Sequence, residues 1–116
     1  MSDFARSVYV RLVALLNANP ETWVHYKPLA LLFRPHRRLS WRGGPLLEAL
    51  GEIVRWCHEH NLPAIPAIVV RVTDGRPGDG FFQVAFPGIL DEKERQRLWR
   101  AEVSRVRQIG YPEVAV

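Results

Sequence analysis

The chain of 116 residues lacks several features, and each absence excludes a class of protein. A single cysteine, Cys57, excludes an internal disulfide and fits a reducing, cytoplasmic location. No apolar run approaches the roughly 20 residues that span a bilayer, and the N-terminus has no secretion-signal pattern. With 47% hydrophobic residues the chain is not of the disordered class. Its length leaves room for one core, so we expect a single domain over residues 1–116 and no membrane partner.

Signatures of catalysis and of metal binding are also missing. His58 and His60 stand two apart on an expected helix and point in different directions, while His25 and His36 have no cysteine nearby. No nucleophile–base pattern occurs, and the glycines of residues 75–80 lie between expected strands rather than before a helix. We therefore predict a protein that is not an enzyme, with no catalytic residue, no metal site and no cofactor.

Acidic residues are absent from one long segment, between Glu21 and Glu48, and the charged residues within it are all basic. Overall, 16 basic residues against 12 acidic ones give a net charge of +4, and 14 of the basic residues are arginines. A planar guanidinium suits phosphate and base edges better than an ammonium group does. The acid-free segment carries five of the basic residues, which are Lys27, Arg34, Arg37, Arg38 and Arg42.

Apolar periodicity and turn residues predict a chain of helices with three short strands. The expected order is a helix over 3–17, a strand over 22–26, helices over 27–33 and 43–60, strands over 66–73 and 80–85, and a helix over 91–107. In the last helix, Asp91 and Glu94 have the spacing of a capping box. Cys57 falls on the apolar stripe of the third helix, where we expect an inert core thiol.

This order predicts the fold class α+β and, within it, a winged-helix-like domain with an extra C-terminal helix. The two strands over 66–73 and 80–85 would form the wing ribbon, joined by a turn of three glycines and a proline. In such domains the loop before the third helix, that helix and the wing approach DNA. We expect arginines to neutralise phosphates and a tryptophan to stack on a base or insert between base pairs. The expected contact residues are Arg34, Arg37, Arg38, Trp41, Arg42 and Arg76.

A protein-interaction module is the alternative that the sequence leaves open. Glu48 and Glu52 on the third helix would repel phosphate. The adjacent Phe81 and Phe82 offer apolar surface to a partner. In this interpretation the chain is a phage- or mobile-element-type inhibitor or adaptor of a host protein, or it pairs with a second copy in a homodimer.

Several motifs between Tyr26 and Phe81 stand in the order of a known DNA-repair family. They are Val-His-Tyr26-Lys-Pro-Leu29-Ala30, Leu47-Glu-Ala49-Leu-Gly51, Asn61-Leu-Pro63, Pro66-Ala67-Ile68-Val69-Val70 and Asp74-Gly75-Arg-Pro-Gly78-Asp-Gly80-Phe81. In order and in small residues, about half of the chain resembles the C-terminal domain of O6-alkylguanine-DNA alkyltransferases and alkyltransferase-like proteins. The resemblance implies a winged-helix fold and DNA as the partner.

The departures from this family exclude its chemistry. The family carries Pro-Cys-His-Arg-Val, whereas Ala67 stands here in place of the alkyl-accepting cysteine. Alkyltransferase-like proteins also lack that cysteine but keep the His and Arg, which Ile68 and Val69 replace in this chain. The resemblance therefore implies no alkyl transfer. The same region also resembles small uncharacterised bacterial and phage proteins, which carry no assigned function.

Overall fold

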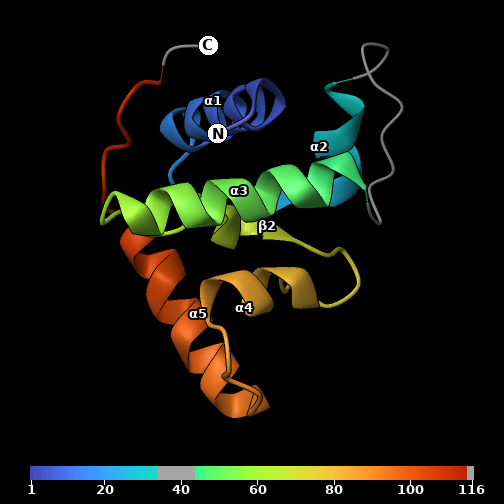
Figure 1. Cartoon of the computed structure of the whole chain (residues 1–116), viewed down its shortest axis with the longest axis vertical. Helices are drawn as coiled ribbons and strands as arrows, with labels where there is room; N and C mark the ends of the chain where they lie inside the picture. Colours follow the sequence, from blue (N-terminus) through green and yellow to red (C-terminus); the bar gives the residue numbers. More distant parts are fainter. Residues whose placement is uncertain (34–43, 115–116) are drawn as a thin grey trace.

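The computed structural model describes residues 1–33 and 44–114 of the chain. In these residues, five α-helices and one 3₁₀ helix surround a pair of very short strands (Figure 1). The elements in order are α1 (Asp3–Ala18), β1 (Val24–His25), α2 (Tyr26–Leu31), α3 (Pro45–Glu59), η1 (Ile65–Ile68), β2 (Val69–Val70), α4 (Asp79–Ala85) and α5 (Glu92–Val106).

The two strands run parallel to each other. Val24 lies opposite Val69, and His25 lies opposite Val70. Parallel strands need a long crossover connection, and here the chain between them contains α2 and α3. The three valines are buried, so the pair joins distant parts of the chain inside the molecule and presents no broad open face.

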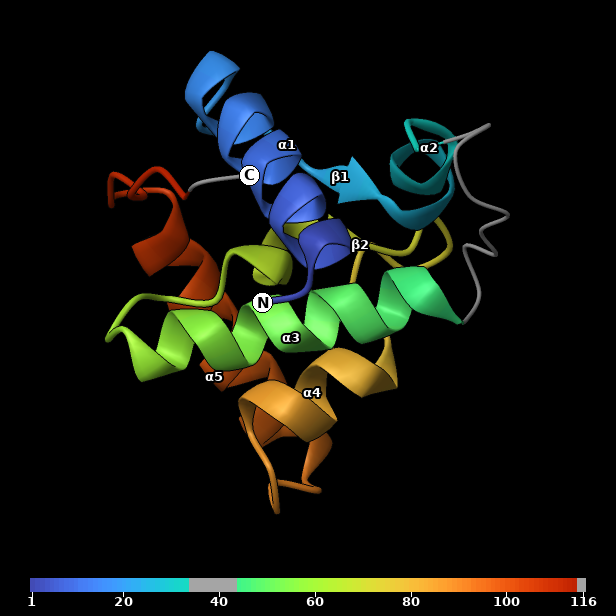
Figure 2. The same cartoon turned by 45° about the horizontal axis from the view of Figure 1, so that its top comes forward.

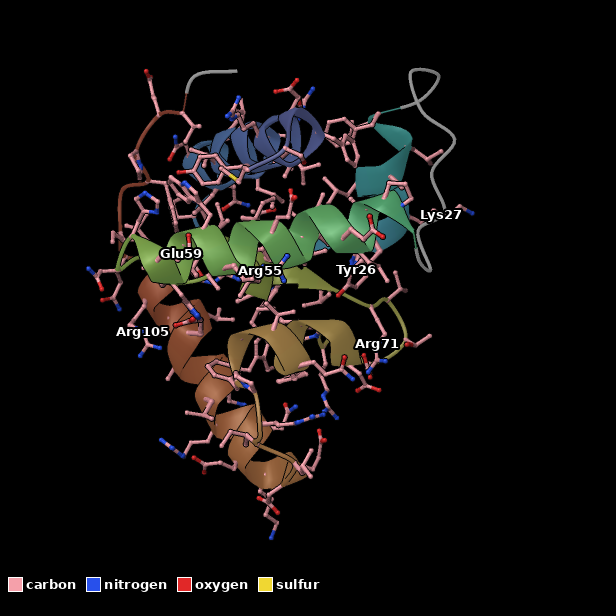
Figure 3. The ribbon with its side chains drawn as sticks, in the orientation of Figure 1. Tyr26, Lys27, Arg55, Glu59, Arg71 and Arg105 are labelled. Atoms are coloured by element: carbon pink, nitrogen blue, oxygen red, sulfur yellow. The ribbon has the colours of Figure 1, made fainter. Side chains whose placement is uncertain are left out.

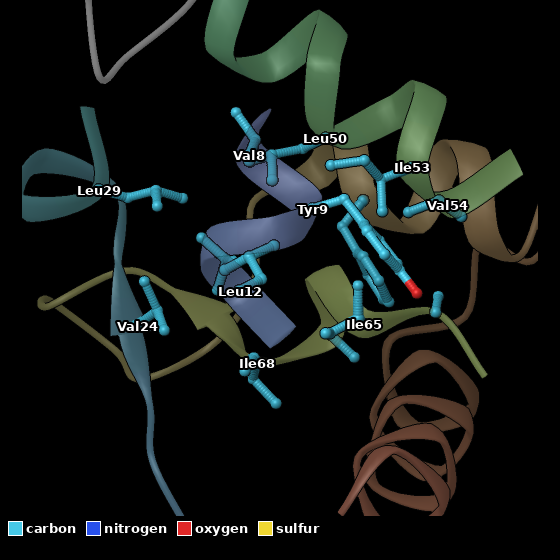
Figure 4. Close-up of a cluster of buried hydrophobic side chains, with 14 of the residues drawn as sticks. Val8, Tyr9, Leu12, Val24, Leu29, Leu50, Ile53, Val54, Ile65 and Ile68 are labelled. Carbon is cyan, nitrogen blue, oxygen red and sulfur yellow. The ribbon is translucent and has the colours of Figure 1, made fainter. Parts of the chain in front are cut away.

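Helix α3 crosses the molecule between α1 and α4 (Figures 1 and 2). Pro45 occupies its first turn, where the missing N–H has no helical partner, and the helix ends before Asn61, whose φ is positive. Burying each large apolar side chain contributes about 1.5–3 kcal/mol. Figure 4 shows part of the core, in which α1, α3 and η1 contribute the buried side chains of Val8, Tyr9, Leu12, Leu50, Ile53, Ile65 and Ile68.

Helix α5 packs against η1 and is joined to it by a buried hydrogen bond. The Nε1 of Trp99 donates to the backbone oxygen of Ala67 at 2.9 Å. Near the end of α5, Arg107 donates to the backbone oxygens of Pro20 and Thr22 and lies over the ring of Trp23. These contacts attach the C-terminal helix both to the centre of the chain and to the segment before β1.

The α+β class and most of the predicted elements are confirmed. The helices expected over 3–17, 27–33, 43–60 and 91–107 correspond to α1, α2, α3 and α5, and the short strand over 22–26 contains β1. The side chain of Asp91 caps α5 by accepting from the backbone N–H of Glu94 at 2.9 Å. These elements have strong local signals, because apolar periodicity, prolines and caps mark their extent.

The second wing strand, predicted over 80–85, is wrong. Residues Asp79–Ala85 form helix α4, and the strand expected over 66–73 is reduced to β2 after the 3₁₀ helix η1. Phe81, Phe82 and Ala85 are all buried, which suits one helical face, whereas a strand would send the two phenylalanines to opposite sides. The described residues therefore contain no antiparallel ribbon, since β2 pairs in parallel with β1.

The helical state of α4 can be tested at Gly80. This residue is exposed, and a Cβ added to it meets no described atom within 4 Å. We expect Gly80→Ala to raise the free energy of unfolding in urea by about 0.5–1 kcal/mol, because alanine favours a helix and restricts the unfolded chain. Gly80→Val should stabilise less, since a β-branched side chain is less suited to a helix.

Gly88 supplies the control, because its φ of +84° disfavours any side chain. Gly88→Ala should lower the free energy of unfolding by about 1–2 kcal/mol. If Gly80→Val stabilised the protein more than Gly80→Ala, residues 79–85 would be better described as a strand.

Candidate functional site

Five of the six residues predicted to contact DNA lie outside the described residues; these are Arg34, Arg37, Arg38, Trp41 and Arg42. The sixth, Arg76, lies in the turn between β2 and α4 and forms an ion pair with Glu92 of α5. Its side chain is 31% exposed, and its Nε is buried without a hydrogen-bond partner in the described part of the chain. Arg76 is thus held against α5, and its role as a phosphate contact stays a prediction.

The turn that carries Arg76 is closed by its own hydrogen bonds. Asp74 accepts from Nε and Nη2 of Arg71 at 3.2 and 2.7 Å, and from the backbone N–H of Arg76 at 3.1 Å. The side-chain hydrogen bonds from Arg71 are the main reason that the pKa of Asp74 is lowered. Gly75 takes a positive φ of 68° at the tip of the turn. The positive charge of Arg71 is therefore partly neutralised by the carboxylate of Asp74.

Tyr26 fixes the start of α4. It is the first residue of α2 and is buried, and its Oη accepts a hydrogen bond from the backbone N–H of Gly78 at 3.0 Å. Burial in the protein raises the pKa of Tyr26 above its usual value. Because Gly78 is the N-cap residue of α4, this bond holds the beginning of α4 against α2.

A groove of about 850 Å³ lies between α3 and α4, with Tyr26 and Arg71 toward its end nearest the N-termini of both helices (Figure 3). This volume falls within the usual range of small-molecule ligand sites. Leu47, on its wall, is 40% exposed although it is a large apolar side chain. Most of the surface area of the lining is apolar, and the apolar side chains on it are those of Leu47, Leu50, Val54, Pro66, Phe81 and Val84.

The charged residues lining the groove are Glu48, Glu52, Asp79, Arg55 and Arg71. Glu52 accepts from the hydroxyl of Ser2 at 2.8 Å, and this hydrogen bond is the main cause of its lowered pKa. Oδ1 of Asp79 lies 4.0 Å from Nη1 of Arg95, which makes this a marginal ion pair. Within the described ranges, Glu48 and Arg55 have no ion-pair partner. The groove therefore combines an apolar wall with a rim that carries more carboxylates than guanidinium groups.

A second hollow, of about 330 Å³, lies beside a buried carboxylate on α5. Glu102 is only 3% exposed and accepts from Nε2 of His58 at 2.8 Å, from Arg105 and from the backbone N–H of Ala64 at 3.3 Å. Burial raises the pKa of Glu102, but the hydrogen bonds from these three donors outweigh it, so the pKa is lowered. The cluster joins α3, α5 and the start of η1. Among the described residues, those that line the hollow include no serine, threonine or cysteine.

The sequence contains a signal for this buried carboxylate, although Glu102 is not among the predicted site residues. Glu102 stands on the apolar stripe of α5 between Trp99 and Val106, where a charged residue must find partners when it is buried. Cys57, by contrast, is a fully buried thiol as predicted, and burial raises its pKa to about 11. In the described ranges no group of three His, Cys, Asp or Glu residues is placed to hold a metal ion. No helix there is long and apolar enough to cross a bilayer.

Replacing Glu102 tests the structural role of this cluster. Because its folded-state pKa lies below the ordinary 4.5, Glu102 stabilises the fold above that pH, and its contribution is lost as the pH falls through the folded-state pKa. We expect Glu102→Gln to lower the free energy of unfolding by about 3 kcal/mol near neutral pH. The difference in the free energy of unfolding between Glu102→Gln and the wild-type protein should narrow as the pH falls below about 4.5.

Urea unfolding at a series of pH values measures this difference. Glu94→Gln is the matched control, because Glu94 lies on the same helix and pairs with Arg97 at the surface. Its effect should be much smaller, since exposed ion pairs contribute little. An equal loss of stability at neutral and acidic pH would contradict the role given to the Glu102 charge.

Comparison with known proteins adds no family to this description. No family model matches the chain. No curated protein and no solved structure is significantly similar to it either. The resemblance to the alkyltransferases therefore stays a prediction, and function has to be inferred from the groove and from the charges of this chain.

Proposed function

We propose that this protein is a non-enzymatic interaction module that binds an apolar segment of a partner protein in the groove between α3 and α4. The observation that carries the proposal is the apolar wall of this groove, about 850 Å³ in volume, with Leu47 left 40% exposed on it. An apolar surface rimmed by polar residues is typical of sites that another molecule covers. A host protein is the partner class that we favour, and a second copy of the chain is the competing one.

The residues of the groove favour binding over chemistry. Its described lining includes no histidine, serine, threonine or cysteine. The hydroxyl of Tyr26 already accepts a hydrogen bond from Gly78, and burial raises its pKa, so it is a poor proton donor at neutral pH. Because no nucleophile stands beside a base among the described residues of the groove, the site supports recognition rather than turnover.

We infer that the similarity to winged-helix domains is confined to the first part of the chain. The order of α1, β1, α2 and α3 is that of the predicted domain. Helix α4 stands where the returning wing strand was expected, and it covers one side of α3. In this interpretation α3 presents an apolar groove where a winged helix would present a DNA-reading surface.

Leu47→Asp tests the interaction proposal. The immobilised protein is first used to select binders from a displayed library of short peptides, and the selected peptides are then titrated against wild type and variant by fluorescence anisotropy. We expect Leu47→Asp to weaken binding by at least about tenfold, because a carboxylate replaces apolar contact area. Circular dichroism checks that the variant is folded, as expected for a side chain that is 40% exposed.

Leu90→Asp is the matched control, since Leu90 is 82% exposed and lies outside the groove. Peptide binding to this variant should equal binding to wild type. If selection yields no binder, or if the two variants behave alike, the groove is not the interaction site.

DNA binding is the second candidate function, and one observation favours it. Between Glu21 and Glu48 the chain carries five basic residues and no acidic one. The contacts proposed for this function remain Arg34, Arg37, Arg38, Trp41 and Arg42, with Arg76 as a sixth whose ion pair with Glu92 must open or be shared. Such residues would bind phosphate without reading the base sequence.

The salt dependence of binding to a mixed-sequence duplex of about 20 base pairs tests this candidate. Replacing both Arg37 and Arg38 with alanine should reduce the slope of log K against log salt by about 2, since two phosphate contacts are lost. The control replaces Arg97 and Arg100 of α5, which removes the same charge elsewhere. If the wild-type protein does not bind the duplex at low salt, DNA is not its partner. If the two double variants reduce the salt slope equally, the basic segment is not the DNA-binding site.

A further inference from the structure

We propose that the partner segment recognised by the groove is a basic amphipathic helix, with an apolar stripe that packs on the groove wall and lysines or arginines that face its rim. This inference rests on the proposed interaction function and adds the chemical class of the partner. Three observations on the groove support it: the sign of its charges, the arrangement of its two helices and the shortage of open strand edges nearby.

The rim of the groove is acidic although the protein as a whole is basic. Three carboxylates line the groove, from Glu48, Glu52 and Asp79, against the two guanidinium groups of Arg55 and Arg71. The charge of Arg71 is further reduced by the carboxylate of Asp74, which lies outside the groove. In a chain with a net charge of +4, this local excess of negative charge favours a positively charged partner.

The two carboxylates least committed to other groups lie at the same end of the groove. Glu48 is in the first turn of α3 and Asp79 is in the first turn of α4. Glu48 has no ion-pair partner among the described residues, and Asp79 is 80% exposed with Arg95 no nearer than 4.0 Å. Both carboxylates are therefore free to pair with cations of a bound segment, beside the exposed apolar side chain of Leu47.

A helix fits this site better than an extended strand. The groove lies between two helices, which is the arrangement that receives the apolar face of a third. Anchors at positions i, i+3, i+4 and i+7 of a partner helix span about 10 Å, and the seven residues of α4 have about the same length. An extended partner strand would find few backbone groups to hydrogen-bond with, because the described strands are two residues long and their valines are buried.

Two designed peptides of about 15 residues test the proposal. Both carry leucines at positions i, i+3, i+4 and i+7, and the remaining positions are alanine with either lysine or glutamate. Binding is measured by fluorescence anisotropy with the wild-type protein at low and at moderate salt. We expect the Leu/Lys peptide to bind at least about tenfold more tightly than the Leu/Glu peptide, and salt to weaken this preference.

Charge reversal separates specific recognition from general attraction. Glu48→Lys combined with Asp79→Lys should abolish the preference for the Leu/Lys peptide. The control, Glu59→Lys combined with Glu113→Lys, changes the net charge by the same amount at exposed positions outside the groove and should leave the preference intact. A preference that survives the first double variant, or falls equally in both, would overturn the inference.

Other outcomes distinguish this inference from the proposed function on which it rests. If both peptides bind equally and Leu47→Asp weakens both, the groove binds helices but the basic class of partner is wrong. If neither designed peptide binds while library-selected peptides bind in a Leu47-dependent manner, the basic helix is overturned and the interaction function stands. Sedimentation that shows a dimer, reduced to a monomer by Leu47→Asp, would assign the groove to a second copy of the chain.

Discussion

The arrangement of this molecule depends on helix α3 being packed on two sides. One side joins α1 and η1 in the core, where Ile53 and Cys57 are fully buried. The other side faces α4, and a Cβ placed on Gly51 would contact Val84 at 3.7 Å. Because α4 has only seven residues against the fifteen of α3, it covers part of that second side. The groove lies between these two helices and is lined by both, so the candidate site depends on how α4 packs against α3.

Many charged side chains of the described residues form ion pairs or hydrogen bonds within the molecule. Six arginines of the described residues form ion pairs with carboxylates, and these pairs are Arg6–Asp3, Arg71–Asp74, Arg76–Glu92, Arg95–Asp79, Arg97–Glu94 and Arg105–Glu102. Arg107 donates instead to two backbone oxygens. Apart from the pair of the buried Glu102, these exposed pairs add little stability, but they reduce the electrostatic field that a distant phosphate would feel. The described surface is accordingly not the basic face that the composition alone suggests.

The elements predicted correctly are those whose signals are local. The cap at Asp91 and the proline at the start of α3 act within one helical turn, so a single sequence reports them. The failure at α4 has a physical reason as well. Phe81 and Phe82 suit a strand by propensity, yet both are buried on a helix that packs against α3 and whose N-cap, Gly78, donates a hydrogen bond to Tyr26. Intrinsic preference was overruled by tertiary contacts.

The sequence by itself determined a small α+β protein with long amphipathic helices, a buried thiol and a basic segment without carboxylates. Periodicity, caps and charge counts are properties of neighbouring residues, so they can be read along the chain. Tertiary structure decided the parallel pairing of β1 with β2, the burial of Glu102 among its donors and the groove between α3 and α4. Each of these depends on groups that are dozens of residues apart, such as Tyr26 and Gly78, whose contact exists only once the core has formed.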